Sequence, residues 1–397
     1  MPSNISQNPW NIPFINGVNY GNTFIPEDFF ADDEFFRANN INKVADQFSL
    51  CDLQGEGAQQ AMEAWLDAQI KEQDFKEMKD FGVTFARLPL GYWNVVDMPG
   101  NPNGPPSEAD RMGNLSKIMP ASGYTTYIDQ IFEFAGKYGI QILLDLHGAP
   151  GSQSGESNSG CSFKYSGEGN YYWDTDWNKL WTKNAVVALA KICQEKGPTC
   201  YGVEVLNEPA FPGGGLDRGH LLSFYQEAIL AARNEGGLSM DVPMMIMEWG
   251  PHWNGFWKGR WNTYFPESKY GKVQLDTHIY DFQNTVQQSE ASWAANQFPL
   301  VKEIAAEVPL LIGEYTLSLN WDIPTQDLQG WASWINANFH KSGVIGGAHW
   351  MWNNKPRKFW SMRSMSTLET PGGIDWKQVF STASRQSHSL EEVSFLM

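Results

Sequence analysis

The chain has 397 residues, of which 14% are aromatic and 18 are tryptophan, and its formal net charge is −17 at pH 7. So negative a charge argues against nucleic acid and against an anionic membrane surface as partners, because both attract basic faces. The charge suits a neutral substrate, and no stretch of the sequence approaches the ~20 apolar residues that span a membrane.

The first ten residues, MPSNISQNPW, have neither the basic region nor the apolar core of a signal peptide. We therefore expect a cytoplasmic protein if Met1 is the native start, and a secreted one if a leader has been removed. Four cysteines in so long a chain do not make a disulfide scaffold, although Cys193 and Cys200 flank a short Gly-Pro loop and could pair. We favour a monomer.

Short apolar runs typical of strands alternate with longer segments of helical periodicity along the whole chain. The runs that we interpret as strands cover residues 14–19, 83–88, 140–146, 202–208, 243–247, 272–278, 308–314 and 344–350. The segments that we interpret as helices cover residues 59–81, 124–138, 176–196, 219–235, 289–307 and 326–341, with a closing helix around Trp376 and Phe380. Two stretches rich in Gly and Ser, residues 97–123 and 151–170, are expected to be long surface loops.

Eight such units without a break in composition predict a single domain over residues 1–397, with an N-terminal extension over 1–13 and a polar tail over 385–397. A doubly wound open sheet alternates in the same way. However, polar residues stand repeatedly at the C-terminal ends of the strands, which is typical of a (β/α)₈ TIM barrel. We therefore predict an α/β protein of this kind, with long βα loops at its C-terminal face.

Two of these strand ends each carry one carboxylic acid. The run over residues 202–209 contains Asn207 and Glu208, and the run over residues 309–315 contains Glu314. Counting strands puts Glu208 on the fourth and Glu314 on the seventh, so the two can face each other across the barrel mouth. Each acid alone could equally be an ordinary polar residue after a strand, but the pair is what glycoside hydrolysis requires. A carboxyl separation of about 5–5.5 Å means retention of anomeric configuration, and a wider one means inversion.

Further polar or aromatic side chains stand at the other strand ends, namely Arg87, His147, His278, Tyr280 and Trp350. Arg87 could keep a carboxylate nucleophile ionised by pairing with it, or it could form an ordinary structural ion pair. The two histidines could bind sugar hydroxyls or hold the carboxylates, and the alternative is that they belong to the core. Tyr280 could donate a hydrogen bond to Glu314, and Trp350 could form the floor beneath a sugar, although an aromatic there is often plain core.

A metal site is the main alternative for these polar residues. The sequence has no His-x-His at a first strand and no His-Glu-x-x-His, and the rim histidines lack carboxylate partners at ligand spacing. A serine nucleophile has little support, because no Gly-x-Ser-x-Gly lies between a strand and a helix. We therefore expect neither a metal nor an organic cofactor.

A series of short motifs follows along residues 17–352. The motifs are Gly17-Val-Asn-Tyr-Gly21 with Glu27 beyond it, Arg87-Leu-Pro-Leu-Gly-Tyr-Trp93, Asp145-Leu-His-Gly-Ala-Pro-Gly-Ser-Gln153, Leu206-Asn-Glu-Pro209, Asp276-Thr-His-Ile-Tyr280, Gly313-Glu-Tyr315 and Trp350-Met-Trp352. In this order they resemble glycoside hydrolase family 5 and, within it, the fungal exo-β-1,3-glucanases. The run that ends in Gly-Ser-Gln is the most specific to this subgroup.

The resemblance implies a retaining glycoside hydrolase that releases glucose from the ends of β-1,3-glucan without a cofactor. It implies that Glu208 is the acid/base, which requires a raised pKa, and that Glu314 is the ionised nucleophile. The residues implied to line the subsite of the cleaved sugar are Arg87, His147, Asn207, His278, Tyr280 and Trp350. Glu27 matches the carboxylate that binds the terminal glucose, which suits an exo-acting pocket.

The chain departs from the family pattern at several positions, none of which is one of the two acids. The departures are Asn22-Thr23 in place of Gly-Trp, Glu156 in place of an aromatic, Phe282 shifted by one position, Tyr315 in place of Trp, and Ala348-His349 in place of two aromatics. They leave the leaving-group subsite open, so an endo-β-glucanase, a mannanase, or a β-glucosidase acting on glucosylated lipids or small glucosides remains an alternative. A barrel that binds glucan without cleaving it is a further alternative, but such a protein usually lacks one of the two acids.

Overall fold

The computed structural model describes residues 8–27, 57–99, 115–161, 173–209, 216–281, 285–319, 327–354, 357–369 and 372–382. None of the helices in these ranges combines the length and the apolar character that crossing a bilayer requires. Some expectations concern residues outside this set, namely the shifted Phe282, the tail over 385–397, and parts of the N-terminal extension and of the two long loops.

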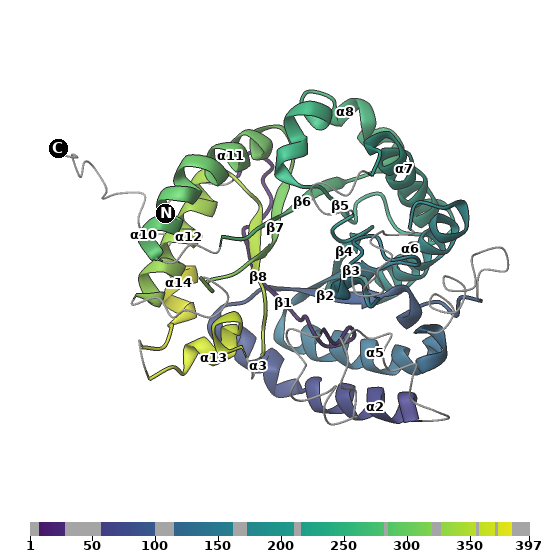
Figure 1. Ribbon diagram of the computed structural model, residues 1–397, viewed down its shortest axis with the longest axis horizontal. Coiled ribbons are helices and arrows are strands. Elements are labelled where there is room, and N and C mark those ends of the chain that lie inside the picture. Colours follow the sequence, from purple (N-terminus) through teal and green to yellow (C-terminus); the bar gives the residue numbers. More distant parts are fainter. Residues whose placement is uncertain are drawn as a thin grey trace.

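Eight parallel strands close into a barrel in chain order, and the last strand pairs with the first (Figure 1). The strands are β1 (Ile15–Asn19), β2 (Phe85–Gly91), β3 (Gln141–Gly148), β4 (Cys200–Glu204), β5 (Met244–Met247), β6 (Val273–Ile279), β7 (Leu310–Tyr315) and β8 (Gly346–His349). The predicted (β/α)₈ barrel is therefore confirmed. Its strands read as apolar runs because helices cover the outside while side chains fill the inside.

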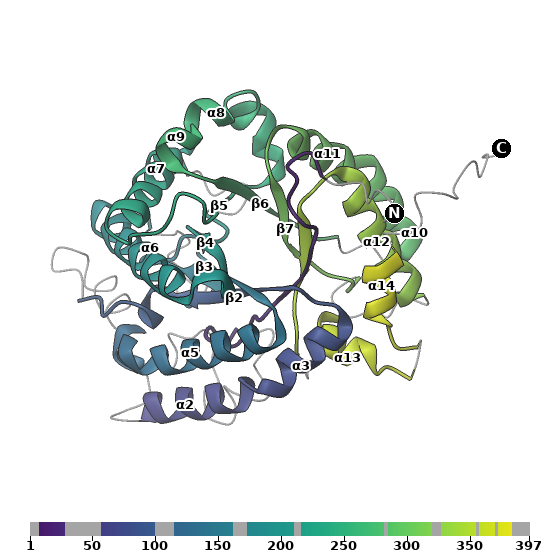
Figure 2. The same cartoon turned by 180° about the vertical axis from the view of Figure 1, so that it is seen from behind.

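Helices surround the barrel, as Figure 1 and the reverse view in Figure 2 show. They are α2 (Gly57–Gln69), α3 (Glu72–Phe81), α5 (Ala121–Tyr138), α6 (Asp176–Lys196), α7 (Arg218–Asn234), α8 (Trp261–Tyr264), α9 (Glu267–Tyr270), α10 (Val286–Ser292), α11 (Phe298–Glu307), α12 (Leu328–Ser342), α13 (Met362–Ser366) and α14 (Trp376–Thr382). Short 3₁₀ turns cover Tyr92–Asn94, Ser157–Ser159, Gly197–Thr199, Gly250–His252 and Lys358–Trp360, and π-helical turns cover Trp253–Trp257 and Trp293–Gln297.

Two helices expected to be continuous are broken. The segment over 59–81 divides into α2 and α3, because Lys71 has an extended backbone (φ −132°, ψ 136°). The segment over 289–307 divides into α10, a π-helical turn and α11. Pro299, in the first turn of α11, has no N–H to donate to the preceding turn, which accounts for the change of register there.

The N-terminal extension and one of the expected loops are packed against the barrel where they are described. The Trp10 indole Nε1 donates to the Ala305 carbonyl at 3.0 Å, at the end of α11. Within the stretch expected to be a loop over 97–123, residues 115–118 are helical, and Leu115 and Ile118 are buried. The apolar side chains of that stretch were the available signal for this helical turn.

The strand that leads to Glu208 is fastened at its start. Cys193, near the end of α6, forms a disulfide with Cys200, the first residue of β4. Strand β4 is shorter than expected, since it ends at Glu204 and not at residue 208. Beyond Glu204 the backbone still hydrogen-bonds to the neighbouring strands, from Val205 N to the Met245 carbonyl and from Asn207 N to the Leu146 carbonyl, before it reaches Glu208.

Candidate active site

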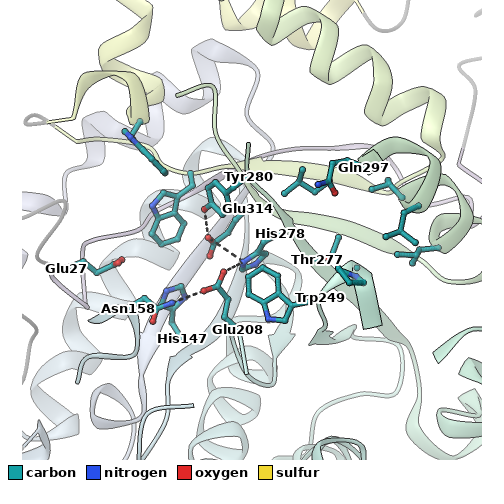
Figure 3. A pocket seen from close by; sticks show the side chains of 18 residues that line it. Glu27, His147, Asn158, Glu208, Trp249, Thr277, His278, Tyr280, Gln297 and Glu314 are labelled. Carbon is teal, nitrogen blue, oxygen red and sulfur yellow. Dashed lines mark hydrogen bonds and ion pairs between the residues drawn. The ribbon is translucent and has the colours of Figure 1, made fainter. Parts of the chain in front are cut away.

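A cavity of about 500 Å³ lies at the C-terminal ends of the strands, a usual place for a catalytic site in this fold. Figure 3 shows Glu208 and Glu314 near its centre. Glu27 lies on the left in this view, Trp249 lies next to His278 near the centre, and Thr277 and Gln297 lie to the right.

The buried guanidinium of Arg87, on β2, organises the floor of this cavity. Its five N–H groups make five hydrogen bonds, to the two carboxylate oxygens of Glu204 and to Asn19, Asn207 and Glu314, at 2.7–3.1 Å. No side chain other than arginine presents five donors in one plane. Arg87 thus links strands β1, β2, β4 and β7 beneath the mouth of the barrel.

Three acidic residues surround Arg87 below the two acids that were predicted. Asp145 approaches its Nη2 at 3.0 Å, Glu204 its Nε at 2.7 Å, and Asp276 its Nε at 3.8 Å. Side chains on a strand alternate between its two faces, so an acid two or four residues before a rim residue shares that residue's face. This spacing was the signal for Asp145 before His147 and for Asp276 before His278.

Glu208 is held by two donors and by a constrained backbone. His278 Nδ1 lies 2.7 Å from its Oε1, and Asn158 Nδ2 donates to its Oε2 at 2.9 Å. The backbone φ of Glu208 is +40°, in the left-handed region that non-glycine residues rarely adopt. Such a conformation persists only where the surroundings impose it, and it clusters at functional sites.

Glu314 accepts hydrogen bonds at both oxygens. Arg87 Nη1 donates to Oε1 at 2.8 Å, and the Tyr280 hydroxyl donates to Oε2 at 2.6 Å. The preceding residue, Gly313, lies so close to Asp276 that a Cβ atom at this position would be 1.9 Å from its carboxylate. The glycine of the Gly-Glu-Tyr motif is therefore needed for the close approach of β6 and β7.

The distance between the two carboxyl groups distinguishes a retaining mechanism from an inverting one. One carboxylate oxygen of Glu208 lies within 4.8 Å of one of Glu314. Retaining glycosidases have carboxyl groups about 5–5.5 Å apart, while inverting enzymes keep them about 6.5–9.5 Å apart to admit water. The geometry matches retention.

His147 and Asn207 lie next to the acids, on β3 and after β4. His147 Nδ1 is 2.7 Å from Asp145, and its Nε2 is 3.4 Å from the Asn207 amide. Burial and the nearby charge of Arg87 lower the pKa of His147 to about 3, so the ring is neutral near pH 7. The Gln153 amide Nε2 donates to the carbonyls of His147 and Asn207 at 2.7 and 2.9 Å, which fixes the two strand ends together.

Glu27 and Trp350 line the cavity beyond the acids. The Trp350 ring is stacked with that of His147, with the ring centroids 5.6 Å apart and the planes 13° from parallel. Gly21 leaves room for this indole, since a Cβ there would lie 2.9 Å from it. Burial, with the charges of Glu314 and Glu208, raises the pKa of Glu27 well above its ordinary value. A protonated Glu27 can both donate and accept a hydrogen bond.

The charged groups of the site shift one another's pKa. Burial opposes a charge on His278, but the carboxylates of Glu314 and Asp276 outweigh it and raise the pKa of His278 well above its ordinary value. Burial also dominates at Glu314, whose pKa is raised against the opposing charges of His278 and Arg87. At Glu208, burial acts upward, but the hydrogen bond from His278 and the nearby positive charges outweigh it, so the pKa of Glu208 is lowered.

The lowered pKa of Glu208 contradicts the expectation of a raised one. The reason is geometric, because His278 Nδ1 lies 2.7 Å from Glu208 and 3.6 Å from Glu314. The hydrogen bond from His278 therefore favours the ionised form of Glu208.

The expectation that the rim histidines lack carboxylate partners is also wrong. His147 contacts Asp145, and His278 contacts Glu208 and Asp276. Among the described residues, His278 forms groups of possible metal ligands with Glu204 and Asp276 and with Glu208 and Glu314. Arg87 already supplies a positive charge to Glu204 and Glu314, so a cation here would face like-charge repulsion.

Comparison with known proteins agrees with this geometry. The family model described as Cellulase (glycosyl hydrolase family 5) matches residues 44–356. A protein of Blumeria graminis named glucan 1,3-beta-glucosidase is 27% identical over 337 residues, which cover 84% of this chain and 70% of that protein. Glucan 1,3-beta-glucosidase 2 of Wickerhamomyces anomalus is 30% identical over 67% of this chain and 56% of its own length.

Solved structures resemble the chain in fold. The rutinosidase from Aspergillus niger superposes with a TM-score of 0.66 at 18% identity, covering 90% of this chain and 98% of its own. A family 5 xyloglucanase from Paenibacillus pabuli gives a TM-score of 0.54 at 14% identity, covering 80% and 91%. At such low identity, these two structures support the barrel fold alone.

Proposed function

The chain belongs to glycosyl hydrolase family 5, and from that premise we propose that it is a retaining exo-β-1,3-glucosidase that releases glucose from the ends of β-1,3-glucan. It is an O-glycosyl hydrolase, as its family and its glucan 1,3-beta-glucosidase relatives indicate. The observation that carries the proposed chemistry is the pair Glu208 and Glu314, with carboxylate oxygens within 4.8 Å of each other and different hydrogen-bond partners.

In the first half of the reaction, a Glu314 oxygen attacks the anomeric carbon, and the bond from that carbon to the leaving oxygen breaks. Arg87 and Tyr280 hold Glu314 from below and from the side, which aims the carboxylate. Glu208 gives its proton to the leaving oxygen, so the leaving group departs as a neutral alcohol. His278 Nδ1 lies 2.7 Å from Glu208 Oε1, so it can hydrogen-bond to this acid during the reaction.

In the second half, water attacks the anomeric carbon of the glycosyl-enzyme, and Glu208 accepts the proton that the water loses. The bond between the sugar and Glu314 breaks, and the carboxylate of Glu314 is regenerated. Two displacements on the same carbon leave the product with the anomeric configuration of the substrate.

Glu27 supports action at a chain end. It is 7% exposed and lies in the wall of the same cavity, away from Trp249. A carboxyl group at this place can bind hydroxyls of a terminal glucose and occupies space that a longer chain would need. Hydrogen bonds from such a buried group favour a sugar that presents free hydroxyls there.

The roles of the two acids are tested by paired variants. We expect Glu314→Gln to abolish turnover without unfolding the protein. We expect Glu208→Ala to keep activity on a 2,4-dinitrophenyl β-glucoside, whose leaving group needs no acid, and to form β-glucosyl azide when azide replaces water. Substantial activity of Glu314→Gln, or an α-configured azide from Glu208→Ala, would refute the assignment.

The substrate is tested by following products over time on laminari-oligosaccharides, with cello- and manno-oligosaccharides in parallel. We expect glucose as the sole early product from the β-1,3 series, while the substrate shortens by one unit at a time. Products of intermediate length would instead indicate an endo-acting enzyme. Cleavage limited to another series would leave the two acids in their roles and overturn the substrate.

A further inference from the structure

The cavity that holds the two acids continues into an arm with apolar walls. This apolar arm is lined by Trp249, Pro251, Ile279, Leu300, Val301 and Ile304. It belongs to the same cavity of about 500 Å³ that contains Glu208 and Glu314. In Figure 3, Trp249, Thr277 and Gln297 mark the direction in which it leaves the acids, opposite to Glu27.

The alternation of side chains along β6 explains how one cavity has both a polar and an apolar wall. Asp276 and His278 face the barrel interior, where Arg87 lies 3.8 Å from Asp276. Thr277 and Ile279 therefore face the surrounding helices. The cavity passes over the end of β6 and reaches α11, which supplies the remaining aliphatic side chains of the arm.

The arm begins where the leaving group departs. The Trp249 ring stands edge-on to the His278 ring, with the centroids 6.0 Å apart, and His278 contacts Glu208 at 2.7 Å. Since Glu208 is the proposed proton donor to the leaving oxygen, the group attached to that oxygen lies on the Glu208 side of the cavity. Glu27 lies on the side of the sugar that is released, and Trp350 also lines the cavity, stacked on His147.

The chemistry of the arm suits hydrocarbon better than a second sugar. Its aliphatic side chains offer no hydrogen bonds, so a glucose unit placed against them would leave hydroxyl groups unpaired. A hydrocarbon chain in the same place removes apolar surface from water at no such cost. Among the lining residues of this part, polar groups come from Thr277, Gln297 and the indole N–H of Trp249.

From this geometry we propose that the enzyme also hydrolyses β-glucosides of aliphatic alcohols, with the alkyl chain bound in the apolar arm. This inference rests on the proposed function, because it uses the same two acids and the same bond cleavage. The bond between the anomeric carbon and the alcohol oxygen breaks, Glu208 protonates that oxygen, and water completes the hydrolysis. Leu300, which is partly exposed on α11, is a specificity-determining residue for the chain.

The test measures kcat/KM for methyl, butyl, hexyl and octyl β-glucoside below their micellar concentrations. We expect kcat/KM to rise by about three- to fourfold for each methylene that enters the arm. The variant Leu300→Gln should lower the octyl-to-methyl ratio by about tenfold. Leu222→Gln is the matched control, since Leu222 is also partly exposed on a helix, α7, and lies outside the cavity lining. This control should leave the ratio unchanged.

Laminaribiose, hydrolysed by the wild type in the same experiment, separates the two proposals. Cleavage of laminaribiose together with equal kcat/KM values along the alkyl series would overturn the apolar arm and leave the proposed function standing. A ratio that Leu300→Gln and Leu222→Gln change equally would also overturn it. No cleavage of any β-glucoside would overturn both proposals.

Discussion

The hydroxyl of Tyr280 offers a clean test of how the site controls the charge of Glu314. It donates to Glu314 Oε2 at 2.6 Å, and Glu314 is only 4% exposed. Tyr280→Phe removes this donor and keeps the ring. The hydrogen bond favours the ionised carboxylate, so its loss favours the protonated acid and raises the pKa of Glu314.

The size of the shift follows from the kind of hydrogen bond. A bond to a charged group contributes about 1.5–3 kcal/mol. One pKa unit corresponds to about 1.4 kcal/mol, so the pKa of Glu314 should rise by about one to two units. Arg87 still donates to the other oxygen at 2.8 Å, which favours the lower end of this range.

The assay is the pH dependence of kcat/KM on an aryl β-glucoside, which reports the ionisation of the unbound enzyme. If Glu314 has to be ionised to attack, the acid limb of the profile should move to higher pH by about one to two units in Tyr280→Phe. Tyr225→Phe is the control, because it removes a buried hydroxyl that donates to the Met247 carbonyl at 2.7 Å.

An acid limb that stays in place in Tyr280→Phe, or moves to lower pH, would refute the reasoning. A shift of the same size in Tyr225→Phe would show that loss of a buried hydroxyl acts through the fold and not through Glu314. A lower plateau of kcat/KM without a shift of the acid limb would mean that Tyr280 stabilises the transition state and does not control the ionisation of Glu314.

Three further outcomes are expected. Asn158→Ala removes the 2.9 Å hydrogen bond to Glu208, which raises the pKa of that acid, so the basic limb of the kcat/KM profile should move to higher pH by about half a unit to one unit. Replacing Cys193 and Cys200 by serine opens a loop with a sequence separation of 7, and the free energy of unfolding measured with urea should fall by about 2–3 kcal/mol; an unchanged urea midpoint would contradict this. Burial lowers the pKa of His340 from 6.5 to about 4. Between these two pH values the unfolded chain binds a proton that the folded chain does not, so the stability of the fold decreases as the pH decreases. The loss of Tm between pH 7 and pH 4.5 should accordingly be smaller in His340→Phe than in the wild type, and an equal loss would contradict the effect.

Much of the barrel was predictable because its signals are local. Each strand is a short apolar run, and each helix has its own periodicity, so the eight units could be counted along the chain. Strand ends in this fold meet at one face, which is why Glu208 and Glu314 could be placed in one mouth before their distance was known. The helix breaks at Lys71 and before Pro299 were missed because the apolar periodicity continues through both positions.

The sequence by itself therefore determined the fold class and the two acids, because a strand and the residue at its end are neighbours in the chain. Tertiary structure decided what those acids contact. The 2.8 Å contact between Arg87 and Glu314 joins residues 227 positions apart, and no periodicity reports such a pairing. The same holds for the direction of the pKa shifts, since His278 lowers the pKa of Glu208 only because its Nδ1 lies nearer to Glu208 than to Glu314. The apolar arm was likewise decided by the tertiary structure, because it forms between β6 and α11. The apolar pattern of each element predicts that its side chains are buried, but it does not predict that a cavity remains between the two elements.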